Sequence, residues 1–408
     1  MKRLFRGLLV LTMLAPAARA EDTLPKIYDL EIGDPVRKAK YAPVRLDTVI
    51  DTRTGDALTP EEAAARMDGI RLLLIGETHT SMDFHRAQYR MIRALHAAGR
   101  RVLVGLEMYP TPQQPFLDQW SAGKLSEDEF IRGSRWYEYW GYHWGFYRDI
   151  FLFAREHRLP MYALNAPREV VQAVRKHGVK GLTPDQAKYM PPQIRFDDPE
   201  HLAYFRASFD DGGGVGHGAA SEEMLKSFAS AQATWDATMG FNAVQALKAV
   251  DDPKAIMVVL VGSGHVAYGI GIAMQARQWL DGGVGTLIPV PVTTQAGRDI
   301  PQVRASYADY VWGLPAETDS EFPRLGISTR TEPAEAEREI ILVEKDSLAA
   351  QAGFRPRDVL VAMDGEPITG RESFNRLMAR KEWGDAATFV VKRGEDEVTL
   401  KVLFRRTR

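Results

Sequence analysis

The chain has 408 residues, of which 45% are hydrophobic and 26% charged, and this composition is typical of a globular protein with two or three domains. Its 52 Lys and Arg residues nearly balance its 54 Asp and Glu residues, so we expect no nucleic-acid partner and no recruitment to anionic membranes by net charge. Cysteine is absent, which excludes disulfides, thiolate metal sites, cysteine nucleophiles and a cysteine-lipidated lipoprotein.

Residues 1–20 have the pattern of a secretory signal peptide. A basic start is followed by the apolar run Leu8–Leu14 and by Ala18-Arg19-Ala20, an A-x-A type of cleavage site. The apolar run is shorter than the roughly 20 residues that span a bilayer, and no later segment reaches that length. We therefore expect cleavage before Glu21, a mature chain without a transmembrane helix, and a location in the periplasm or cell envelope. Residues 21–44 are polar and interrupted by proline, which predicts an extended lead-in.

Aliphatic runs predict the strands of a first domain, residues 45–314. Uninterrupted runs of this kind are typical of strands that are covered on both faces, and their alternation with helical patterns favours a mainly parallel α/β sheet flanked by helices. The strands are expected at 71–75, 102–106, 256–261 and, more weakly, 159–164. The helices are expected at 82–98, 146–156, 168–177 and 222–249. A glycine-rich stretch at 210–217 predicts a loop, either a lid or a plain connector.

A second, small β-rich domain is predicted at residues 324–408. The short polar and proline residues at 315–323 indicate a linker. Beyond it, four strand-like runs alternate with only two short helical segments, and about 85 residues suffice for an independent fold. These runs cover 339–343, 359–363, 388–393 and 398–404.

Polar side chains gather where the predicted strands of the first domain end. Ligands of parallel α/β sheets bind beyond the carboxyl ends of the strands, so these groups are candidates for one crevice. They are Glu77, His79, Glu107, Arg168, His265 and Tyr268. Structural roles stay open for each: a histidine bonded to a backbone carbonyl, Glu77 as a helix cap, or Glu107 paired with Arg168.

The segments around these residues resemble the ChaN family of iron-regulated, haem-binding proteins, which belongs to a superfamily with the Tiki, TraB and erythromycin-esterase proteins. The resemblance spans about residues 45–300 and includes two Gly-x-x-His motifs, Gly76–His79 and Gly262–His265. It is carried by LLLIGETHTSMDFHRAQYRMIRALHAAGRRVLVGLEMYP, WGYHWGFYRDI, LPMYALNAPREVV and VGSGHVAYGIG.

The resemblance implies that haem is held between two protomers of a homodimer. A tyrosine of one protomer ligates the iron and a histidine of the other bonds the propionates; Tyr268 and His79 are the best matches. His265, Glu77, Glu107 and Arg168 complete the implied haem site, with Glu107 expected to orient His79 or to pair with Arg168. A phenolate suits ferric iron. The aromatic stretch 136–147 either walls the haem or packs the core.

Residues 324–406 resemble a bacterial PDZ domain of the kind associated with HtrA proteases, above all through Gly353–Gly365 (GFRPRDVLVAMDG). The resemblance implies that the loop Arg324-Leu325-Gly326-Ile327 binds the terminal carboxylate of a peptide, while the adjoining strand accepts the peptide as an added strand. Partner proteins with free C-termini are the expected ligands. A PDZ fold used only for packing is the alternative.

The leading hypothesis is thus a non-enzymatic, exported protein of haem handling and iron uptake with PDZ-mediated docking. The alternative is a metal-dependent hydrolase like the Tiki, TraB or esterase relatives, in which Glu77, His79, Glu107 and His265 would bind Mn, Co or Zn or activate water. A vestigial pocket in a structural adaptor is a third hypothesis. A serine hydrolase is disfavoured, because Ser263 is not followed by the G-x-S-x-G pattern of a nucleophile elbow.

Overall fold

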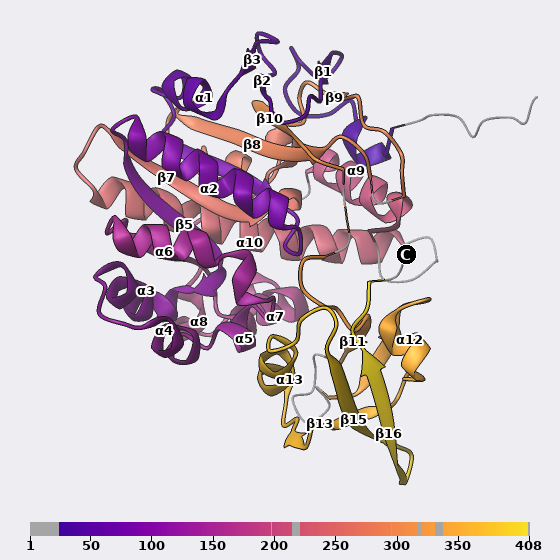
Figure 1. Ribbon diagram of the computed structural model, residues 1–408. Coiled ribbons are helices and arrows are strands. Elements are labelled where there is room, and N and C mark those ends of the chain that lie inside the picture. The colour runs from indigo at the N-terminus through magenta and orange to yellow at the C-terminus, as the bar shows by residue number, and fades with distance from the viewer. Residues whose placement is uncertain are drawn as a thin grey trace, which may run out of the picture.

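The structure is a computed structural model that describes residues 24–196, 198–213, 221–294, 296–316, 318, 320–330 and 338–406. The predicted signal peptide, residues 1–20, and residues 214–217 of the predicted loop at 210–217 lie outside these residues, whereas Phe209–Gly213 form a short π-helical turn. Two compact units are visible in Figure 1: a large one that contains a twisted sheet and helices, and below it a smaller one coloured from orange to yellow.

The large unit is built on an eight-stranded sheet with the order β3-β2-β10-β8-β4-β7-β5-β6. The strands from β10 to β6 run parallel, and only the edge strands β2 and β3 are antiparallel. The strands are β2 (Val49–Asp51), β3 (Ala57–Leu58), β4 (Leu72–Glu77), β5 (Arg101–Pro110), β6 (Met161–Asn165), β7 (Ala255–Gly262), β8 (Val284–Pro291) and β10 (Tyr310–Leu314). A separate pair joins β1 (Tyr41–Pro43) to β9 (Gln302–Arg304).

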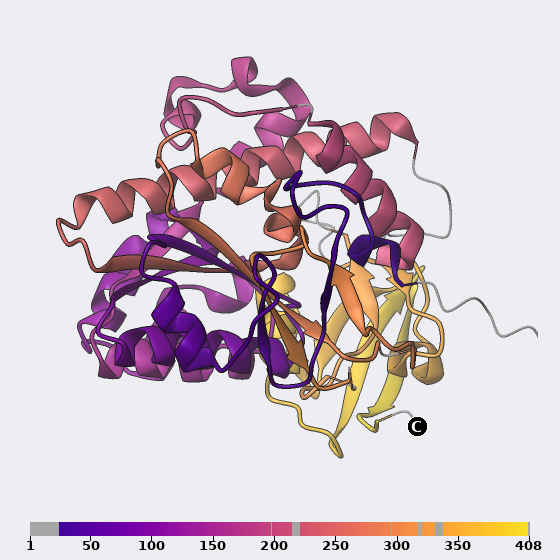
Figure 2. The same ribbon diagram turned by 90° about the horizontal axis from the view of Figure 1, so that it is seen from above.

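Helices cover both faces of this sheet, as Figure 2 shows from above. On one face lie α1 (Pro60–Arg66), α2 (Met82–Ala97), α3 (Gln114–Ser121), α4 (Glu127–Gly133), α5 (Trp136–Tyr139) and α6 (Arg148–Glu156). The other face is covered mainly by α10 (Glu222–Ala249), α11 (Ile272–Ala276) and α9 (Pro199–Ser208), with α7 (Arg168–His177) packed beside α10. A short helix, α8 (Pro184–Ala187), follows α7.

The pattern of buried side chains explains why the strands are apolar throughout. Along β7, Ile256, Val258 and Leu260 enter the core on the α2 side. The residues between them, such as Met257 and Val259, enter the core on the α10 side. Because successive side chains of a strand point to opposite faces, a strand covered on both sides must be hydrophobic at every position. The predicted mainly parallel α/β fold is confirmed.

The smaller unit has a core of its own, which includes Leu325, Ile340, Leu360, Phe389 and Phe404. Its strands form the pair β11–β12 and the antiparallel sheet β14-β13-β15-β16. The bounds are β11 (Ile327–Thr329), β12 (Ile340–Val343), α12 (Leu348–Ala352), β13 (Val359–Met363), β14 (Glu366–Pro367), α13 (Arg371–Met378), β15 (Ala386–Arg393) and β16 (Asp396–Leu403). This confirms the predicted small β-rich second domain.

The four strands predicted for the first domain occur as β4, β5, β6 and β7, and the four predicted helices as α2, α6, α7 and α10. The sequence analysis missed β8, β10 and the two antiparallel edge strands. Prolines at 289 and 291 interrupt the aliphatic run of β8, and only residues 310–314 form β10, so neither strand stands out in the sequence. Among the described residues, no helix combines the length and the apolarity needed to cross a membrane.

Candidate functional site

The two Gly-x-x-His motifs lie side by side, because β4 and β7 are neighbouring parallel strands with Glu77 in register with Gly262. Both chains turn at the same edge of the sheet, the edge at which parallel sheets bind ligands. The close approach requires a glycine at position 76, since a Cβ atom there would lie 2.8 Å from the Ser263 hydroxyl oxygen. His79 and His265 therefore follow neighbouring strand ends, and their shared role in a site stays a prediction.

The first motif is organised around the buried carboxylate of Glu77. This carboxylate accepts hydrogen bonds from His79 Nδ1 (2.7 Å), from Gln88 Nε2 (2.7 Å) and from the hydroxyl of Tyr147. Burial alone would raise the pKa of Glu77, but the electrostatic interactions with His85 and His79 and the hydrogen bonds from His79 and Tyr147 lower it to about 2. Glu77 is thus an anion that orients His79, and it does not cap a helix.

The second motif places its histidine between two carboxylates from other elements. His265 Nδ1 donates to Asp236 of α10 (2.5 Å), and its Nε2 lies 3.4 Å from Oε1 of Glu107 at the end of β5. Burial would lower the pKa of His265, but Asp236 and Glu107 raise it to about 10. At neutral pH His265 is therefore an imidazolium, which can donate hydrogen bonds but has no free lone pair for a metal ion.

Glu107 does not have the role that the sequence suggested. Its carboxylate accepts a hydrogen bond from the backbone N–H of Gly262 (2.8 Å) and faces His265. It neither orients His79, which Glu77 does, nor pairs with Arg168. Arg168 is exposed at the start of α7 and has no acidic partner among the described residues.

A cavity of about 790 Å³ opens beyond these strand ends. Glu107, His265 and Arg168 line it together with the aromatic side chains of Tyr139, Trp140 and Trp235. One wall comes from the second domain, through residues 369–373 at the start of α13. The volume lies within the range of about 300–1,000 Å³ that is typical of small-molecule and cofactor sites.

Tyr268 lies elsewhere. It lines a different cavity together with Gly33 and Glu200, and it does not line the strand-end cavity. The Tyr268 hydroxyl donates to the carbonyl of Ile27 (2.8 Å) and accepts from the N–H of Leu30 (3.1 Å), so the lead-in segment covers this oxygen. Burial raises the pKa of the phenol, which holds it in the neutral form. Iron ligation by Tyr268 stays a prediction, and it requires that the lead-in release the hydroxyl.

Several site residues were missed by the sequence analysis. His85 and Gln88 lie three positions apart on α2, and Asp236 is a fully buried acid on α10. Each is a polar side chain on the buried face of a helix, and this feature of the sequence could have identified them. In the aromatic stretch 136–147, Trp136, Trp144 and Tyr147 pack in the core, and Tyr139 and Trp140 line the strand-end cavity.

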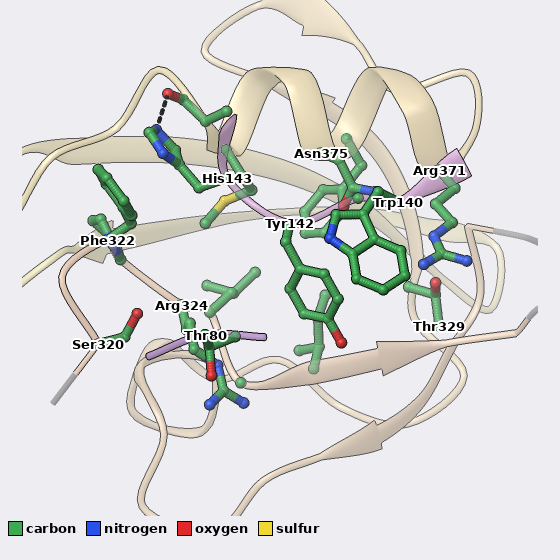
Figure 3. Close-up of a pocket in the computed structure, with 18 of the residues that line it drawn as sticks. Thr80, Trp140, Tyr142, His143, Ser320, Phe322, Arg324, Thr329, Arg371 and Asn375 are labelled. Carbon is green, nitrogen blue, oxygen red and sulfur yellow. Dashed lines mark hydrogen bonds between the residues drawn. The ribbon is translucent and has the colours of Figure 1, made fainter. Parts of the chain in front are cut away.

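The predicted peptide-binding loop, Arg324 to Ile327, lines a third cavity, of about 440 Å³ (Figure 3). Gly326 has a φ of +79°, and a Cβ atom there would lie 2.3 Å from Cβ of Ser347, so only glycine fits. Within the part of the chain that the structure describes, the N–H groups of Leu325 and Gly326 have no hydrogen-bond acceptor. Free N–H groups at a tight turn suit a carboxylate.

The metal-hydrolase alternative gains no support from the geometry. Among the described residues, no group of three or more His, Asp or Glu side chains is arranged to hold a metal ion.

Two family matches divide the chain. Residues 63–275, more than half of the chain, match the family described as "Haem-binding uptake, Tiki superfamily, ChaN". Residues 323–403 match the PDZ domain family. No curated protein matches the chain.

Three solved structures are similar to parts of the chain. The structure "Cofacial heme binding to ChaN of Campylobacter jejuni" has 16% identity and a TM-score of 0.49, and the match covers 66% of this chain and 98% of that one. The structure "HtrA-type protease AlgW with decapeptide" has 25% identity and a TM-score of 0.19, with 21% of this chain and 30% of that one covered. A serine endoprotease from Yersinia pestis has 18% identity and a TM-score of 0.19, with the same coverage.

Proposed function

Because the chain belongs to the ChaN family of haem-binding proteins and carries a PDZ domain, we propose that it binds and handles haem in the cell envelope and docks a partner protein through that PDZ domain. The mature chain begins near Glu21 in this proposal. The composition of the strand-end cavity is the observation that carries the haem assignment.

The lining of this cavity fits the chemistry of haem. Haem needs apolar, flat walls and cationic or hydrogen-bonding groups for its two propionates. Tyr139, Trp140 and Trp235 provide aromatic surface. Arg168 offers a guanidinium without an acidic partner among the described residues, and guanidinium binds carboxylates through two parallel hydrogen bonds. Both ring nitrogens of His265 already face carboxylates, those of Asp236 and Glu107, so Arg168 is the proposed propionate donor.

The remaining site residues position these groups. Glu107 holds His265 and the turn at Gly262, and Glu77 fixes the ring of His79 through Nδ1. Bound haem would supply a ferric iron, for which a phenolate oxygen is a suitable ligand. In our proposal Tyr268 provides this oxygen. Since Tyr268 and the strand-end cavity are separate in one chain, the proposal includes a homodimer in which two protomers share the haem.

Titration of the purified full-length mature chain with hemin tests the haem assignment. Wild-type protein should bind hemin with a distinct visible spectrum. Arg168→Ala should weaken binding by about 1.5–3 kcal/mol, the usual value of a hydrogen bond to a charged group. Arg175→Ala is the matched control, because Arg175 is an exposed arginine of the same helix that lines none of the three cavities. Equal hemin affinity of both variants and wild type would remove Arg168 from the site.

PDZ docking is tested with a peptide and its amidated form. Amidation removes the negative charge that the N–H groups of the Arg324–Ile327 loop are proposed to bind, so affinity should fall by at least roughly tenfold, the equivalent of about 1.4 kcal/mol. Unchanged affinity after amidation would contradict recognition of free C-termini.

A further inference from the structure

One side of the groove of the PDZ domain is lined by the first domain. The cavity of about 440 Å³ lies between β11 and α13, and its outer wall is formed by side chains of residues 140–146 together with Thr80. In Figure 3 the rings of Tyr142 and Trp140 lie between the helix that carries Asn375 and Arg371 and the strand below it. The sequence analysis assigned neither ring to the peptide site.

Specific contacts hold the two domains in this arrangement. Asn375 Nδ2 of α13 donates to the carbonyl oxygen of Tyr137 (3.0 Å), and His143 Nε2 lies 3.0 Å from the carbonyl oxygen of Ala379. The His143 ring also stacks on Phe322, with ring centroids 3.5 Å apart and an interplanar angle of 20°. These contacts flank the cavity, so the segment from 137 to 146 is fixed against the groove.

We propose that residues 140–146 of the first domain complete the peptide-binding groove, and that the last, apolar residue of a bound C-terminus packs on Tyr142 and Trp140. The proposal rests on the peptide docking proposed above and adds the specificity-determining wall. The occupant is the free C-terminus of a partner protein with an apolar terminal side chain.

Three features of the described residues support this occupant. The N–H groups of Leu325 and Gly326 have no acceptor, as a carboxylate site needs. β11 pairs only with β12, which leaves its other edge available for an added strand. The remaining lining is largely apolar and includes Ile327, Phe374 and Met378. A terminal carboxylate at the loop would therefore place its side chain among hydrophobic and aromatic groups.

The same wall also borders the haem site. Trp140 lines both the groove and the strand-end cavity. The ring of His79 contacts both Trp140 and Tyr142, with centroid distances of 4.7 and 5.1 Å. A ligand in one cavity thus meets side chains that form the wall of the other, so peptide and haem binding should be energetically coupled.

Peptide binding to variants of the full mature chain tests the wall. The probe is a fluorescent ten-residue peptide that ends in valine with a free carboxylate, measured by anisotropy. Tyr142→Ala and Trp140→Ala should each weaken binding by roughly tenfold, as expected for aromatic side chains at the centre of an interface. Tyr142→Phe should retain wild-type affinity because it keeps the ring. Phe228→Ala, at an exposed aromatic residue outside these cavities, is the matched control and should also retain it.

The outcomes separate the two proposals. If wild type binds the free peptide but not the amidated one, and the alanine variants bind equally well or more tightly, the composite groove is wrong while peptide docking stands. If wild type binds neither peptide, docking itself is wrong.

The coupling has its own measurement. Saturating peptide should change the hemin affinity of the wild type by the same factor by which saturating hemin changes the peptide affinity. Trp140→Ala should bring this factor close to one. A factor of one in the wild type would contradict the shared wall.

Discussion

The two Gly-x-x-His motifs have the same spacing and occupy neighbouring strand ends, yet their histidines have different environments. His79 receives its carboxylate from Glu77, two residues earlier at the end of β4, and the His79 side chain is 26% exposed beside aromatic rings. His265 is 12% exposed and receives Asp236 from α10 and Glu107 from β5. One motif thus supplies its own charge, whereas the other depends on helices and strands far away in the sequence.

This difference indicates that the two histidines have different roles at the site. The His79 ring is oriented locally and faces the wall that borders the peptide groove. The His265 ring is held as a cation by carboxylates from two elements, α10 and β5, and lines the strand-end cavity. Variants that remove one partner at a time test whether the two histidines differ in this way.

The largest effect is expected at Asp236, the buried partner of His265. Asp236→Asn removes the negative charge but keeps the shape, so the imidazolium keeps only Glu107 as a counter-ion. Removing one member of a buried ion pair typically costs about 3–5 kcal/mol. Urea unfolding at pH 7 measures this loss. Asp185→Asn, which breaks the exposed pair with Lys188, is the control and should cost less than about 1 kcal/mol. An equal loss of unfolding free energy in the two variants would show that Asp236 does not stabilise His265 in the folded state.

The pH dependence of stability should distinguish the two motifs, because the contribution of His265 is lost at high pH and that of Glu77 at low pH. The pKa of His265 is raised from 6.5 to about 10, so its stabilising contribution is complete below pH 6.5 and is lost as the pH rises toward 10. The pKa of Glu77 is lowered from 4.5 to about 2, so its contribution is complete above pH 4.5 and is lost as the pH falls toward 2. Each amounts to a few kcal/mol, at about 1.4 kcal/mol per pKa unit.

Thermal unfolding of His265→Gln and Glu77→Gln across pH 2–10 is the measurement. His265→Gln should flatten the alkaline side of the stability profile, and Glu77→Gln the acid side. An alkaline side unchanged in His265→Gln, or an acid side unchanged in Glu77→Gln, would contradict the assigned protonation states.

A smaller effect is expected when Glu107 is neutralised. In a haem carrier, Glu107→Gln weakens the hold on His265 and should reduce hemin affinity by only about 1–3 kcal/mol, the scale of a lost charged hydrogen bond. In a metal-dependent hydrolase the same change would cost orders of magnitude in turnover. We expect no turnover of peptide or ester substrates by wild type with Mn, Co or Zn. An activity that the metals induce in wild type and that Glu107→Gln abolishes would overturn the carrier proposal.

The smallest effect on stability is expected at Tyr268. Tyr268→Phe keeps the buried ring and removes only the hydroxyl that bonds Ile27 and Leu30, a loss of about 1 kcal/mol in unfolding free energy. The proposed iron ligation predicts that the variant loses the tyrosinate-type hemin spectrum while it remains folded. An unchanged hemin spectrum would assign the ligand to another side chain.

The local signals of the sequence were sufficient for much of the fold. Uninterrupted aliphatic runs predicted β4, β5, β6 and β7, because a strand buried on both faces tolerates no polar position. Strand-end glycines and polar residues indicated the site, since parallel strands bring their carboxyl ends to one edge. The GFRPRDVLVAMDG segment indicated the PDZ fold. This reasoning selected Glu77, His79, Glu107, Arg168 and His265, whose role in a binding site stays a prediction.

Only the tertiary structure decided which of these groups contact one another. The partner of His265 is Asp236, and no local pattern links residues 29 positions apart on different elements. The lead-in segment, which lies more than 200 residues earlier, decides that the Tyr268 hydroxyl is covered. The position of the PDZ groove against Trp140 and Tyr142 likewise depends on packing between domains. Sequence periodicity indicates burial and local turns. Which charged side chains pair, and which side chains line two cavities, depends on how distant elements pack together.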